Sequence, residues 1–181
     1  MQSITFISTI HKQIGKCNAD ELCKILEKIT PEVVFLEALE DTYSEYQQYT
    51  FSNFEVFHEK LEIRALQKYS FISQFEYVPV LVEGLADSFD KKFNLVCQNI
   101  HFQKMLDNFN SLAFIKGFDF LNSEESIKIH EEMSKFGDSI LMDSELIQTF
   151  NNDIDKYENS MISSIYSFCM NTKFKIGRAH V

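Results

Sequence analysis

Two ionisable side chains directly follow apolar stretches near the start of the chain. His11 comes after Ile4 to Ile10, and Glu37 comes after the apolar run Val33 to Leu36. If these stretches are neighbouring parallel strands, both side chains reach one crevice, because open α/β sheets bind ligands beyond the carboxyl ends of their strands. A neutral imidazole and a carboxylate can ligate a divalent metal ion. Alternatively, His11 could be a general base that Glu37 orients.

A third carboxylate stands in the same kind of position. Glu83 follows Phe75 to Val82, a third candidate strand, and could join His11 and Glu37 around a divalent metal ion. The alternative interpretation is that strand ends lie at the surface, where charged residues collect without any function. The spacing leaves both interpretations open.

The elements that position these residues can be read from the same region. Ile4 to Ile10 is rich in Ile, Thr and Phe and predicts a strand. Asn18 is placed to cap a helix that ends before Pro31. Val33 to Leu36 is short and continuously apolar, which is typical of a strand buried on both faces of a parallel sheet. The order strand, helix, strand predicts a right-handed βαβ unit.

The remainder of the chain predicts mostly helices. We expect a polar loop or loosely helical insert over 41–52 and helices over 54–69, 88–115, 123–136 and 144–170, with Gly117 as a C-cap. Pro79 predicts that the strand within 75–82 either lies at a sheet edge or is short, since proline cannot donate to a ladder. The predicted class is α/β: a helix-rich chain with a small, mostly parallel sheet flanked by helices, and with its C-terminal strand or strands missing.

Composition excludes several classes of function. The chain has 181 residues, which fits one domain, and a formal net charge of -10 without a basic cluster, so nucleic acid and anionic membranes are disfavoured as partners. The start of the chain does not read as a signal peptide, and no apolar stretch is long enough to cross a bilayer. The four cysteines form no Cys-x-x-Cys pair and predict reduced thiols. We therefore expect a cytoplasmic protein.

The last six residues of the chain match a sequence that is not of protein-coding origin. Ile176 to Val181 matches, residue for residue, the in-frame translation of a widely used sequencing adapter. We expect residues 175–181 to derive from that adapter, and residues 1–174 to be a single, incomplete α/β domain whose gene continues further. The alternative is a genuine, frayed C-terminus.

Three short motifs together resemble the TraB/Tiki-like family. Ser8-Thr9-Ile10-His11 is similar to its Gly-x-x-His at a strand end, with Ser8 in place of the glycine. Pro31 to Glu37 is similar to its Pro-acid-apolar run ending in Glu. Tyr157 to Met161 is similar to its Glu-Arg-Asn helix motif, with the Arg absent. Related folds include an esterase-like group and a haem-linked lipoprotein group.

The resemblance implies more than one function, because a fold does not fix its chemistry. Tiki-like members are metal-dependent peptidases, and TraB-like members shut down peptide pheromones. By resemblance, His11 and Glu37 would be catalytic, Glu158 would support them, and a divalent metal ion would be the cofactor. The leading hypothesis is thus a metal-dependent hydrolase of peptide or ester bonds. The alternatives are a non-catalytic protein that binds a peptide or small molecule, and an inactive fragment.

Overall fold

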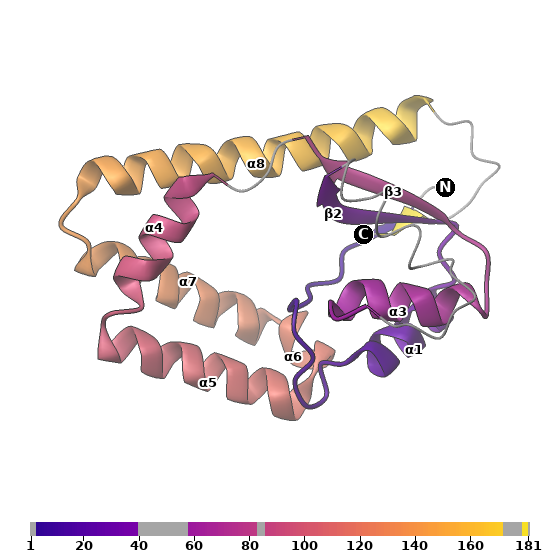
Figure 1. The fold of residues 1–181 in the computed structure, drawn as a ribbon, viewed down its shortest axis with the longest axis horizontal. Coiled ribbons are helices and arrows are strands. Elements are labelled where there is room, and N and C mark those ends of the chain that lie inside the picture. The colour runs from indigo at the N-terminus through magenta and orange to yellow at the C-terminus, as the bar shows by residue number, and fades with distance from the viewer. Residues whose placement is uncertain (1–2, 40–57, 83–85, 172–178, 181) are drawn as a thin grey trace.

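The fold is a small parallel sheet flanked by helices, as the sequence predicts. A computed structural model describes residues 3–39, 58–82, 86–171 and 179–180 (Figure 1). Its strands are β1 (Ile4–Thr5), β2 (Val33–Leu39), β3 (Glu76–Leu81) and β4 (Ala179–His180), and all pairings are parallel in the order β1-β4-β2-β3. Pro79 lies in the edge strand β3, which confirms the prediction made from its missing donor.

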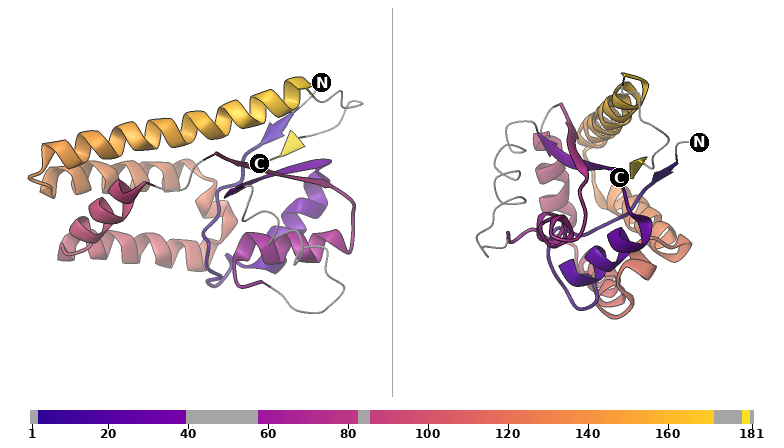
Figure 2. Two further views of the ribbon diagram at one scale, coloured as in Figure 1. Left: turned by 45° about the horizontal axis from the view of Figure 1, so that its top comes forward. Right: turned by 90° about the vertical axis from the view of Figure 1, so that its right-hand side faces the viewer.

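Strand β2 is buried on both faces because helices cover both sides of the sheet. Val34 and Leu36 pack with α1 (Ala19–Ile29) and α3 (Leu61–Ser70), whereas Val33 and Phe35 pack with Ile165 of α8 (Ser144–Asn171). This alternation follows from the two-residue period of a strand. The views in Figures 1 and 2 agree on the layers, with α8 on one face and α1 and α3 on the other.

The remaining helices extend the molecule beyond the sheet. They are α4 (Asp87–Val96), α5 (Ile100–Lys116), α6 (Phe118–Leu121) and α7 (Glu124–Ile140). Helix α8 runs alongside both the sheet and this group of helices (Figure 1). The single helix expected over 88–115 is wrong, because the chain breaks between α4 and α5. Asn99 caps α5 by accepting from the backbone N–H groups of His101 and Phe102, which favours a new helix there.

Several predicted boundaries differ from the structure. The first strand is limited to Ile4–Thr5, although the sequence predicts a strand to Ile10. Helix α3 begins at Leu61, later than expected, while residues 54–57 and the expected loop 41–52 lie outside the described ranges. Helix α7 continues past Gly137 to Ile140, and Gly117 closes α5 with φ +67°, as a C-cap requires.

The end of the chain takes part in the sheet. Ala179–His180 forms β4, which pairs with β1 on one side and β2 on the other. The first two strands are therefore not direct neighbours, since β4 lies between them. All four strands remain parallel, so their carboxyl ends still point to the same edge. The adapter origin of residues 175–181 stays a prediction.

Two further expectations concern membrane-spanning segments and the state of the cysteines. Within the described ranges, no helix combines the length and apolar character needed to span a membrane. All four cysteines are free; Cys17 and Cys23 are buried, and Cys97 and Cys169 are half-buried.

Candidate active site

A small pocket beside the middle of β2 contains His11 and Glu37, although Glu37 lies within β2 and not after it, and His11 lies beyond the end of the short strand β1. It has a volume of about 130 Å³, and His11 and Glu37 both line it. Thr9, Lys60 and Glu62 supply its other polar groups, above an apolar floor of Leu22, Leu26, Ile63 and Leu66. The pocket thus joins side chains from β2, from α3 and from the segment that follows β1.

Glu62 is the member of this group that sequence reasoning missed. Its Oε1 lies 3.4 Å from His11 Nδ1 and also accepts a hydrogen bond from Thr9 Oγ1. The Glu62 side chain is only 14% exposed, against 69% for His11. A backbone bond of 3.3 Å from Leu61 N to His11 O fixes the start of α3 beside this segment. A lone acidic residue in an amphipathic helix gives no sequence signal for such a role.

The pair carries opposite pKa shifts. The hydrogen bond to Glu62 is the main cause that raises the pKa of His11 above its ordinary 6.5, and the Glu37 charge adds to it. Burial works to raise the pKa of Glu62, but hydrogen bonds from His11 and Thr9 outweigh it, so the pKa is lowered overall. Glu62 is therefore ionised and holds the proton of His11 on Nδ1, which leaves Nε2 for a ligand.

Glu37 is held by a residue on the opposite layer. It follows Val33 and Phe35 along β2 and is exposed. The hydroxyl of Tyr157, on α8, donates to Glu37 Oε1 at 2.5 Å. Burial, together with this bond, raises the pKa of Tyr157, so the phenol stays protonated and remains a donor. Tyr157 is a second residue that sequence reasoning did not assign to the site.

The other predicted site residues lie elsewhere. Glu158 is exposed on α8 and does not line the pocket; its neighbour Tyr157 makes the contact with Glu37 instead. Glu83 lies outside the described residues. Within the part of the chain that the structure describes, no three His, Cys, Asp or Glu side chains are grouped so that they could hold a metal ion. The described residues thus do not supply a metal centre by themselves.

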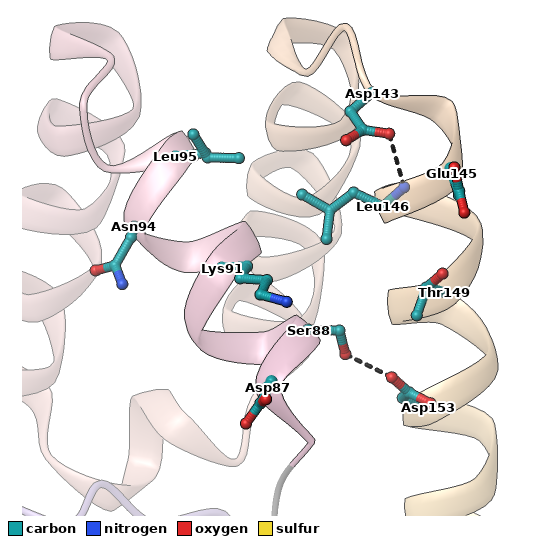
Figure 3. A pocket seen from close by; sticks show the side chains of 10 residues that line it. All are labelled: Asp87, Ser88, Lys91, Asn94, Leu95, Asp143, Glu145, Leu146, Thr149 and Asp153. Carbon is teal, nitrogen blue, oxygen red and sulfur yellow. Dashed lines mark hydrogen bonds between the residues drawn. The ribbon is translucent and has the colours of Figure 1, made fainter.

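Two larger hollows lie along α8, away from His11. One, of about 730 Å³, separates α4 from α8 (Figure 3). Some of its polar groups are engaged: Ser88 Oγ donates to Asp153 Oδ2 at 2.6 Å between the helices, and Asp143 Oδ1 accepts from Leu146 N at 2.9 Å at the start of α8. The other, of about 360 Å³, shares Asp153 and reaches Tyr157. Neither of them, nor a third hollow of about 440 Å³ beside α5 and α6, is lined by a histidine, whereas the smaller pocket is.

Comparisons with known protein families, with curated proteins and with solved structures find no match for this chain. The assignment of a function therefore depends on the geometry of the pocket.

Proposed function

We propose that the protein is a hydrolase of peptide or ester bonds that acts at the pocket of His11, Glu37 and Glu62. The observation that carries this proposal is the contact of 3.4 Å between His11 Nδ1 and the largely buried Glu62, in a pocket that Glu37 also lines. An imidazole oriented by a carboxylate is an arrangement that general acid–base catalysis uses. The similarity of the His11 and Glu37 motifs to TraB/Tiki-like proteins supports the same class of reaction.

The geometry suggests how the reaction would proceed. His11 Nε2 removes a proton from a water molecule, the water oxygen bonds to the substrate carbonyl carbon, and the C–N or C–O bond breaks as the imidazolium returns the proton to the leaving group. Ionised Glu62 stabilises the imidazolium during these steps. Tyr157 donates to one oxygen of Glu37, and the negative charge of Glu37 adds to the stabilisation of the imidazolium.

Size limits what enters the pocket. Its volume of about 130 Å³ is below the several hundred Å³ typical of sites that enclose a drug-sized ligand. We infer that only the scissile group and the attacking water enter, while the rest of the substrate lies on the surface.

A metal-dependent version of this reaction stays a prediction. The described residues lack a three-ligand set, so no step above passes through a metal ion. The proposed cytoplasmic location likewise stays a prediction.

The test is turnover of mixed peptide and ester substrates by the full chain, with and without added divalent metal ions and with a chelator. We expect His11→Gln to lower kcat by about 100-fold or more, since a general base contributes roughly that factor. His130→Ala is the matched control, because His130 is an exposed histidine on α7 outside the pocket. Equal turnover by wild type and His11→Gln would sink the proposal. Saturable binding of a substrate without turnover would favour the non-catalytic alternative.

A further inference from the structure

The segment that carries His11 presents alternate side chains to the pocket. Ile7, Thr9 and His11 all line it, whereas the residues between them do not. This two-residue period is that of a strand, in which successive side chains point to opposite sides. A slip of one residue would therefore turn Thr9 and His11 away from Glu62. The register of the segment thus decides whether His11 and Glu62 can meet.

Within the described ranges, strand pairing does not reach this segment. Strand β1 ends at Thr5, and its pairing with β4 involves only Ile4 and Thr5. The backbone groups that follow need other partners, because an unpaired backbone donor or acceptor is costly unless it meets water. Leu61 N donates to His11 O at 3.3 Å, which holds the last residue of the segment.

The side chain of Asn122, directly after α6, holds the middle of the segment. Its Oδ1 accepts a hydrogen bond from Ser8 N at 2.6 Å, and its Nδ2 donates to Ser8 O at 3.2 Å. Nδ2 also donates to Phe118 O at 3.0 Å, which ties the amide to its own helix. An amide that meets both backbone groups of one residue pairs with it as a residue on a neighbouring strand would. A slip of one residue would break both bonds to Ser8.

We propose that Asn122 is a positioning residue of the candidate site. By setting the register of the segment, it holds His11 and Thr9 against Glu62 without touching the pocket itself. Its importance for hydrolysis rests on the proposed function, in which His11 removes a proton from water.

Packing by itself would not fix this register. Ile10 packs against the core cluster that contains Phe118 and Leu121 of α6, so the segment already lies on that helix. Apolar contacts are non-directional, however, and tolerate a shift along the surface. The two bonds between Asn122 and Ser8 are directional, so they select one position.

The test is the pKa of His11, measured by NMR titration in the wild type and in Asn122→Ala. We expect this pKa to lie above 6.5 in the wild type and to fall toward 6.5 in the variant, because a displaced His11 loses its hydrogen bond to Glu62. In turnover assays, Asn122→Ala should lower kcat about tenfold or more with a smaller change in KM, since a small displacement of a reacting group can cost about 100-fold in rate.

Asn99→Ala is the matched control, because it removes the same kind of side chain from another helix end. Asn99 Oδ1 accepts from the backbone N–H groups of His101 and Phe102 at the start of α5. The substitution should destabilise the protein through the lost cap and leave the pKa of His11 as in the wild type.

Amide hydrogen exchange tests the same contact in the wild type alone. The Ser8 N–H, which donates to Asn122 Oδ1, should exchange more slowly than it would in an unstructured peptide. An unchanged His11 pKa in Asn122→Ala, an equal fall in Asn99→Ala, or a Ser8 N–H that exchanges at the peptide rate would each overturn the proposal. Titration and exchange need no substrate, so their results are independent of the proposed hydrolysis.

Discussion

Gly15 fixes the segment that carries His11, and its replacement by alanine should destabilise the protein. Gly15 has φ +48°, in the left-handed region, and a Cβ there would lie 2.3 Å from Phe114 O and 2.7 Å from Phe114 Cγ. The left-handed conformation costs alanine about 1–2 kcal/mol. The clash also threatens the hydrogen bond of 3.0 Å from Lys16 N to Phe114 O, worth about 1 kcal/mol. Together these terms predict a loss of about 2–3 kcal/mol in the free energy of unfolding.

The same substitution at Gly137 is the internal control. Gly137 lies inside α7, and its nearest heavy atom to a new Cβ would be Val96 Cγ1 at 3.4 Å, an ordinary contact. Alanine at this position should stabilise the helix by about 0.5–1 kcal/mol.

Thermal unfolding followed by circular dichroism, together with urea unfolding, measures both changes. For a chain of this size each kcal/mol corresponds to about 2–4 °C, so Gly15→Ala should lower Tm by roughly 4–12 °C, and Gly137→Ala should raise it slightly. The reasoning is refuted if Gly15→Ala unfolds at the wild-type temperature, or if the two variants change stability in the same direction.

Three further predictions concern the candidate site and helix α1. The raised pKa of His11 contributes stability that is complete below pH 6.5 and is lost as the pH rises through that raised pKa, whereas the lowered pKa of Glu62 contributes stability that is lost as the pH falls below 4.5. A double-mutant cycle of urea unfolding should therefore find the coupling free energy between His11 and Glu62 largest between pH 4.5 and pH 6.5. This coupling should be below about 1 kcal/mol because His11 is exposed. Tyr157→Phe removes the donor to Glu37 and should reduce kcat more than it changes KM in steady-state assays; an unchanged kcat would count against the assigned role of Glu37. Asn18→Ala removes the side-chain cap of α1 and should cost about 1 kcal/mol in urea unfolding, whereas Asn18→Ser should restore most of it.

Local signals in the sequence predicted much of the fold. The continuous apolar run at Val33 identified a doubly buried strand, and Pro79 identified an edge strand, because each depends on the chemistry of one short segment. The break at Asn99 was missed because the apolar residues of α4 and α5 continue in a helical pattern across it, and only the cap distinguishes two helices from one. The place of β4 between β1 and β2 could not be read from Ala179–His180, since two residues carry no strand pattern.

The site was predicted only in part for a related reason. His11 and Glu37 follow apolar runs, and both line one pocket, although Glu37 lies within β2 and His11 lies in the segment beyond β1. Glu62 and Tyr157 come from α3 and α8, and their contacts depend on how these helices pack on the sheet. Helical spacing along one chain segment gives no register against another, so these partners could be found only in the structure.

The most direct test of the pairing between His11 and Glu62 is an NMR titration of the His11 imidazole in the wild type and in Glu62→Gln. The pKa of His11 should lie above the ordinary 6.5 in the wild type and fall in the variant, because the hydrogen bond to Glu62 and the charge of Glu62 both raise it. A His11 pKa that does not change in Glu62→Gln would contradict the pairing on which the proposed active site depends.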